Sequence, residues 1–166
     1  MRKLLIGISL LAMLLTPVGT HAATGITASD TLQQIAQVRQ ATAKYHDVNE
    51  ALADGYIPVS GCEAIPGMGV MGIHYLNPAL ASDLAVAPLA PDLLLYVPSG
   101  DGLRLVGVEY WVASVGQPTP SVLGQTFDGP MAGHSPGMPE HYDLHAWVWQ
   151  ANPAGMFAAW NPTVSC

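Results

Sequence analysis

The stretch Leu103-Arg-Leu-Val-Gly-Val-Glu-Tyr-Trp-Val-Ala113 is the longest segment of the chain with the composition of a β-strand. β-Branched and aromatic residues dominate it, and such residues favour strands. Alternation of strand side chains predicts one apolar face made of Val106, Val108, Tyr110 and Val112. Glu109 then lies on the opposite face among apolar neighbours, where an unpaired carboxylate is costly. We expect a metal ion, another cation or a proton donor beside Glu109; an ion pair with Arg104 is the alternative.

Shorter segments on both sides of this stretch have the same strand-like character. Further strands are expected at Tyr56–Val59, Val70–Leu76, Leu93–Val97, Tyr142–Gln150 and, with a less regular pattern, Met156–Trp160. The sequence Pro-Ser-Gly-Asp-Gly at 98–102 predicts a hairpin connection. Residues 114–140 are rich in proline and predict a long loop, and a loop of that length within a compact domain usually has a function or lacks order.

A helix is predicted before the first strand, from Ser29 or Asp30 through about Asp54, with Gly55 at its end. Apolar residues recur along it at spacings of three, four and seven, as on one face of a helix: Leu32, Ile35, Val38, Tyr45, Val48 and Leu52. One helix followed by five or six short strands is typical of an α+β fold. We predict one long N-terminal amphipathic helix packed on an antiparallel β-sheet that could curl into a barrel.

The first 22 residues have the pattern of a signal peptide. Arg2 and Lys3 precede an apolar run at 4–15, and Thr20-His-Ala22 places small residues at the cleavage positions. The run of about 12 residues is too short to cross a bilayer as a helix, which takes about 20. We expect residues 1–22 to be removed, which leaves 23–166 as a single periplasmic or secreted domain without a stable membrane anchor.

The charge of this mature domain restricts its partners. Three basic residues stand against twelve acidic ones, a formal charge of −9. Nucleic acids and anionic membranes bind basic patches, so neither is an expected partner. A metal ion or another small-molecule ligand suits this charge.

The chain has two cysteines, Cys62 and Cys166. An even pair in an exported domain predicts a disulfide. Closing a loop of about 100 residues would stabilise the fold by roughly 4–5 kcal/mol through the entropy of the unfolded chain. The alternative is a pair of thiolate metal ligands.

Four of the five histidines that follow the signal peptide lie in two stretches that are also rich in methionine, Met68–Tyr75 and Met131–His145. Imidazole and thioether groups are ligands for copper and zinc. Histidines in strands are also often plain hydrogen-bonded residues of the core. The clustering nevertheless favours a site for a transition metal, copper or zinc before iron.

Strand geometry selects among these ligands. Asp143 and His145 share a strand face about 6.6 Å apart, close enough to bind one ion, and His141 and Asp143 are an alternative pair with the same spacing. His141 and His145 are about 13 Å apart by the same measure, so His141 or His134 would have to reach the ion from the loop. On a concave sheet the central strand residues meet, and the predicted ligands are His74, Glu109 and His145 with one of Asp143, His141 or His134.

These patterns lead to one functional hypothesis and two alternatives. The hypothesis is an exported transition-metal-binding protein, with Glu109 as an alternative general base if the site is catalytic. The first alternative is a module that binds an apolar small ligand in a pocket lined by tryptophans: Trp111, Trp147, Trp149 and Trp160. The second is a structural exported protein whose histidines satisfy hydrogen bonds in the core.

The order of several motifs resembles a group of small exported bacterial proteins of unassigned function. The matching segments include Met71-Gly-Ile-His-Tyr-Leu-Asn-Pro78, Leu105-Val-Gly-Val-Glu-Tyr110 and His141-Tyr-Asp-Leu-His145, and the likeness covers nearly the whole mature chain. The resemblance implies export and a single compact domain. The ligand types are also similar to those of cupin metal sites, but the His-x-His spacing of cupins is missing, so no cupin residue is carried over.

Overall fold

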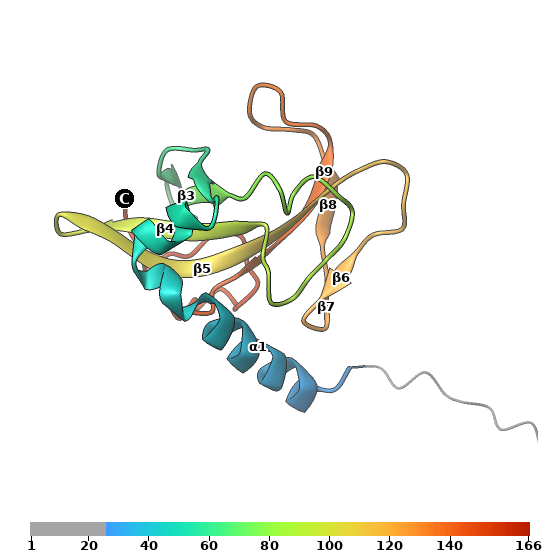
Figure 1. Cartoon of the computed structure of the whole chain (residues 1–166), viewed down its shortest axis with the longest axis horizontal. Helices are drawn as coiled ribbons and strands as arrows, with labels where there is room; N and C mark the ends of the chain where they lie inside the picture. The colour runs from blue at the N-terminus through green and yellow to red at the C-terminus, as the bar shows by residue number, and fades with distance from the viewer. Residues whose placement is uncertain (1–25) are drawn as a thin grey trace, which may run out of the picture.

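The computed structural model describes residues 26–166, in which a helical segment covers one face of an antiparallel sheet (Figure 1). The predicted signal peptide, residues 1–22, lies outside the described residues. Within the described range no helix is both long and apolar enough to cross a membrane. The mixed helix and strand composition agrees with the predicted α+β class.

The N-terminal helical segment is interrupted, so the prediction of one long helix through Asp54 was wrong. It consists of α1 (Ala28–Thr42), a 3-10 turn η1 (Ala43–His46) and α2 (Val48–Ala53). The break occurs at Asp47, where the backbone is extended (φ −90°, ψ 112°) and the side chain accepts a hydrogen bond from the N–H of Asn49. Aspartate competes for backbone hydrogen bonds in this way and therefore favours the start of a new helix.

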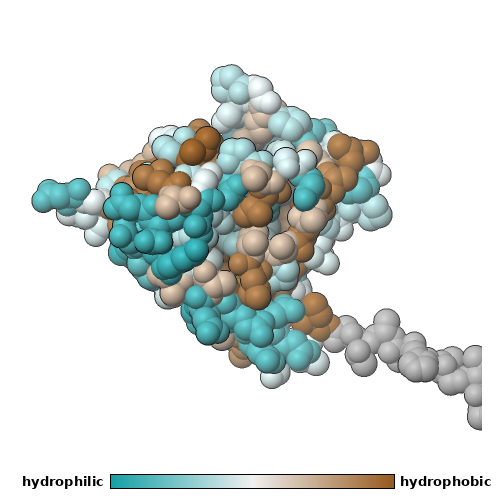
Figure 2. Space-filling model, viewed as in Figure 1, coloured by the Kyte–Doolittle hydropathy of each residue, from teal (hydrophilic) through white to brown (hydrophobic). Residues whose placement is uncertain are grey.

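Burial along the helical segment follows only part of the predicted apolar stripe. Ile35 and Val38 are fully buried against the sheet, whereas Leu32 is 65% and Leu52 46% exposed. The N-terminal cap is also earlier than predicted, because Thr27 and Asp30 form a reciprocal capping box. The outer surface over the helices is mainly hydrophilic (Figure 2).

All strand pairs of the sheet are antiparallel, and within the described residues the sheet does not close into a barrel. The strands run in the order β1-β3-β4-β5-β9-β8, with β2 also paired to β3. Their bounds are β1 Ile57–Pro58, β2 Glu63–Ile65, β3 Gly69–Leu76, β4 Leu93–Ser99, β5 Gly102–Ala113, β8 Asp128–Met131 and β9 His141–Ala146. A separate small hairpin joins β6 Ser121–Val122 to β7 Gln125–Thr126.

The long central strands were predicted well and the irregular C-terminal part was not. The expected hairpin connects β4 to β5, with Ser99 opposite Gly102. The strand predicted at 142–150 ends at Ala146, because the backbone N–H of Trp147 leaves the sheet and donates to Met156 O. Residues 156–160 form no strand, and the loop predicted at 114–140 contains β6, β7 and β8.

The two faces of the sheet differ in chemistry. The face toward the helices carries the main core, which includes Leu94, Tyr96, Val108 and Tyr110. The opposite face carries a smaller apolar cluster around Trp147 and, beside it, the ionisable residues described below. The predicted Cys62–Cys166 disulfide is present, closes a separation of 104 residues and holds the C-terminal end against the segment that precedes β2.

Candidate metal centre

Three strands place His74, Glu109 and His145 together on the sheet face that points away from the helices. Glu109 on β5 lies directly opposite His145 on β9. His74 comes from β3, on the far side of β4, where its partner is Leu95. All three side chains are buried.

The distances within this cluster fit a metal ion. His74 Nε2 is 3.4 Å and His145 Nε2 is 3.7 Å from the same oxygen, Glu109 Oε2. One ligand atom from each of the three residues lies within 4.8 Å of the others. In a tetrahedral site with bonds of about 2.0–2.1 Å the ligand atoms are about 3.3–3.4 Å apart, so a small ion fits with little movement.

Three polar atoms of the cluster have no hydrogen-bond partner within residues 26–166. Glu109 Oε2 and both ring nitrogens of His145 are buried and lack a hydrogen bond. Buried polar groups are nearly always hydrogen-bonded, because an unpaired one costs about 1–3 kcal/mol. A cation bound between the three side chains would pair with the carboxylate and with one ring nitrogen of each histidine at once.

Burial sets the charge of the three groups. It raises the pKa of Glu109 well above its usual value, and the nearby Asp143 and Glu63 raise it further. Burial lowers the pKa of His74, and it lowers the pKa of His145 to about 3. Both imidazoles are therefore neutral at pH 7, the form that binds metals, while the carboxyl group of Glu109 resists ionisation unless a cation is bound beside it.

A hydrogen bond from the loop before β2 selects the nitrogen that His74 presents to the site. Ser60 donates its hydroxyl hydrogen to Gly61 O, so Ser60 Oγ is left as an acceptor for His74 Nδ1–H at 2.9 Å. The backbone N–H of His74 also donates to Ser60 Oγ. With Nδ1 protonated, the lone pair is on Nε2, the nitrogen that faces Glu109.

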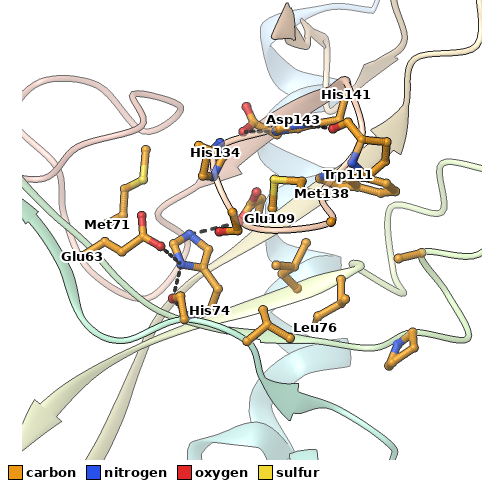
Figure 3. A pocket seen from close by; sticks show the side chains of 18 of the residues that line it. Glu63, Met71, His74, Leu76, Glu109, Trp111, His134, Met138, His141 and Asp143 are labelled. Carbon is orange, nitrogen blue, oxygen red and sulfur yellow. Dashed lines mark hydrogen bonds and ion pairs between the residues drawn. The ribbon is translucent and has the colours of Figure 1, made fainter. Parts of the chain in front are cut away.

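The cluster lies in a pocket of about 410 Å³ (Figure 3). The loop between β8 and β9 contributes residues 134–139 to its rim. Apolar side chains line much of the wall: Val59, Met71, Leu76, Pro78, Leu93 and Met138. A site buried in the sheet thus faces a space large enough for a small molecule.

The other predicted ligands line the same pocket outside the three-residue cluster. Asp143 follows the predicted strand face, but its nearest imidazole is that of His141, with Oδ2 3.8 Å from His141 Nε2. His134 is exposed on the rim, and its ring lies 5.3 Å from that of His141. The alternative ion pair of Glu109 with Arg104 is not formed, because Arg104 donates to Gln150. The disulfide removes the cysteines as ligands.

Two parts of the site were missed or misplaced by sequence reasoning. Ser60 and Glu63, which both approach His74 Nδ1, were not predicted; their only signal is that they flank Cys62. Of the four tryptophans only Trp111 lines this pocket within the described residues. Trp147 and Trp149 line a separate hollow, so the pocket is not walled by tryptophans as the first alternative required.

No protein-family model, curated protein or solved structure matches the chain. The resemblance to a group of small exported bacterial proteins stays a prediction. Function is therefore inferred from the geometry of the cluster and its pocket.

Proposed function

We propose that this chain is an exported protein that binds one transition-metal ion through His74, Glu109 and His145. The observation that carries the proposal is the convergence of three buried ligand atoms, two of which have no hydrogen-bond partner within residues 26–166. Two histidines and a glutamate are a ligand set of catalytic zinc sites. Export is proposed from the sequence of residues 1–22, and the disulfide agrees with an oxidising compartment.

A purely structural role for the histidines is less consistent with the contacts. A structural histidine in a core satisfies its ring nitrogens with hydrogen bonds. His145 satisfies neither of its nitrogens within the described chain, although it is fully buried. His145 Nε2 instead lies 3.7 Å from Glu109 Oε2, within the three-residue cluster.

The ligand types favour zinc or copper over iron. Two imidazoles and one carboxylate suit zinc, which prefers four ligands at short distance. Met71 and Met138 line the pocket and would add thioethers, which are soft ligands typical of copper sites. His134 on the rim, or Asp143 or His141 deeper in the pocket, is the proposed source of a fourth protein ligand.

The arrangement also supports catalysis, which we propose as a second step. With only three protein ligands the ion would keep a position for water or substrate, and it would then polarise a carbonyl or lower the pKa of that water. Glu109 would accept the proton as general base if the ion uses only the histidines. The apolar walls orient the substrate and exclude water from the buried cluster.

The proposal is tested by calorimetric titration of chelator-treated mature protein with Zn²⁺ and with Cu²⁺. We expect one ion per chain for the wild type and at least about a hundredfold weaker binding for His74→Gln, which loses a ligand. The matched control is His46→Ala, because His46 packs against Trp149 and is outside the pocket. No saturable binding of either metal, or equal losses in both variants, would refute the site.

A further inference from the structure

A second pair of buried polar groups lines the same pocket beside the proposed ion site. Trp111 Nε1 and His141 Nε2 both lack a hydrogen-bond partner within residues 26–166. The two rings are stacked, with centroids 5.7 Å apart and an angle of 25° between their planes. They come from neighbouring strands, β5 and β9, and Figure 3 shows them together at one side of the pocket.

The hydrogen-bonding roles of these two atoms are defined by their surroundings. An indole N–H can only donate. His141 Nδ1 lies 3.1 Å from the carbonyl oxygen of Pro139, which can only accept, so Nδ1 carries the hydrogen and Nε2 is a bare acceptor. The closest carboxylate oxygen, Asp143 Oδ2, is 3.8 Å from Nε2 and too far for a hydrogen bond. This wall therefore offers one donor and one acceptor side by side.

The charge of the pocket further restricts the ligand. Its lining includes Glu63, Glu109 and Asp143 and, within the described chain, no lysine or arginine. The basic side chains of this part of the chain are engaged elsewhere: Arg39 with Val148 O, Lys44 with Asp54, and Arg104 with Gln150. An anionic ligand would thus find no cationic side chain to pair with.

We propose that the Trp111–His141 wall binds a small neutral molecule through a group that both accepts and donates a hydrogen bond, an amide or a hydroxyl. The group accepts from Trp111 Nε1 and donates to His141 Nε2, and the apolar remainder packs on Leu76 and Leu93. A carboxylate cannot donate to His141 and an ammonium cannot accept from Trp111, so each leaves a buried group unpaired. As the polar handle of a substrate next to the ion, this group deepens the proposed function and rests on it.

The test uses four probes of similar size: benzamide, benzyl alcohol, benzoate and benzylamine, each titrated into ¹⁵N-labelled mature protein up to its solubility limit. The indole N–H signals are followed by two-dimensional NMR, and the signal missing in Trp111→Phe identifies Trp111. Benzamide and benzyl alcohol are expected to shift the Trp111 signal saturably, and the two charged probes to bind at least about tenfold more weakly. The Trp147 and Trp149 signals are internal controls, because their N–H groups donate to Ala158 O and Thr42 Oγ1.

Two variants locate the binding. His141→Phe keeps a ring against Trp111 but removes the acceptor, and should weaken benzamide binding at least about tenfold. His46→Ala, outside the pocket, should leave it unchanged. If His141→Phe does not fold, Trp111→Phe, followed by saturation-transfer NMR on benzamide, must show the same loss. Equal binding of benzoate and benzamide to metal-free protein, an equal loss in His46→Ala, or no shift with any probe would overturn the proposal.

Titrations of metal-free and zinc-loaded protein separate this inference from the proposed function. Benzamide binding to a protein that takes up no metal would support binding at the Trp111–His141 wall and would contradict the proposed metal site. Benzamide binding that appears only in zinc-loaded protein would overturn the proposed binding at the Trp111–His141 wall, because the ion alone would then account for it.

Discussion

Replacing Glu109 with glutamine distinguishes an effect on ion binding from an effect on folding, because glutamine keeps the shape of the side chain and removes its charge. Burial raises the pKa of Glu109 well above its usual value, so the carboxyl group of the metal-free wild-type protein resists ionisation. A raised carboxyl pKa lowers the stability of the native state as pH rises from the unfolded value toward the folded one. The metal-free Glu109→Gln variant should therefore unfold at the same temperature as the wild type or at a higher one.

The effect of zinc on the two proteins should differ strongly. At free zinc one hundred times the dissociation constant, binding stabilises the wild type by about 2.7 kcal/mol. Loss of an outer partner of a ligand already costs roughly 10–100-fold in affinity, so loss of the ligand itself should cost at least about a hundredfold. The variant then gains only about 0.4 kcal/mol at the same free zinc. For a domain of this size these gains correspond to roughly 8–13 °C and 1–2 °C in Tm.

The assay is thermal unfolding followed by circular dichroism with and without buffered zinc. Glu63→Gln is the matched control: Glu63 Oε1 lies 3.8 Å from His74 Nδ1, but the side chain is 33% exposed and is not part of the cluster. It should keep most of the wild-type shift. A full zinc-induced shift in Glu109→Gln would refute the assignment of Glu109 as a ligand.

Three further predictions concern stability. Burial lowers the pKa of His145 to about 3, so as pH falls below about 6.5 only the unfolded chain takes up this proton. The free energy of unfolding of metal-free wild type, measured in urea relative to that of His145→Gln, should therefore fall by up to roughly 5 kcal/mol between pH 6.5 and 3, and a constant difference between the two proteins would contradict the lowered pKa. Replacing Cys62 and Cys166 with serine opens a loop of 104 residues and should lower the free energy of unfolding by about 4–5 kcal/mol. An unchanged free energy of unfolding in urea would contradict a stabilising role for the disulfide. Gly72→Ala places a Cβ 2.6 Å from a carbonyl oxygen of β4, whereas Gly67→Ala, also at positive φ, meets nothing within 4 Å. The first substitution should lower the free energy of unfolding by about 1–3 kcal/mol more than the second. Equal losses would show that the close approach is unimportant.

Sequence reasoning worked where the period of a strand is long and regular. The alternating pattern around Glu109 predicted both its strand and the face on which it lies. The prediction was wrong for Val106, which packs with Trp147 and not with Val108, because the pairing of β4 with β5 shifts register between Leu95 and Tyr96. The same alternation placed Asp143 and His145 on one face, and the structure shows both lining the pocket. The alternation of residues within one strand could not predict the order of the strands in the sheet. That order places His74 on β3 and Glu109 on β5 on either side of β4, with their side chains in contact.

The failures have tertiary causes. The helix prediction relied on periodicity and missed that Asp47 caps a second helix. Asp143 was preferred as a partner for His145 from strand spacing, but the carboxylate turns to His141. The contact of Ser60 with His74 depends on how the chain before β2 folds back over β3, and no pattern in the sequence encodes that.

Metal content tests the central claim most directly. Plasma mass spectrometry would be applied to the protein purified without an affinity tag, beside a His145→Ala variant, with circular dichroism to check that both are folded. We predict about one zinc or copper ion per wild-type chain and its loss from the folded variant. A wild-type protein that holds no metal at neutral pH, even after incubation with zinc and copper, would contradict the claim.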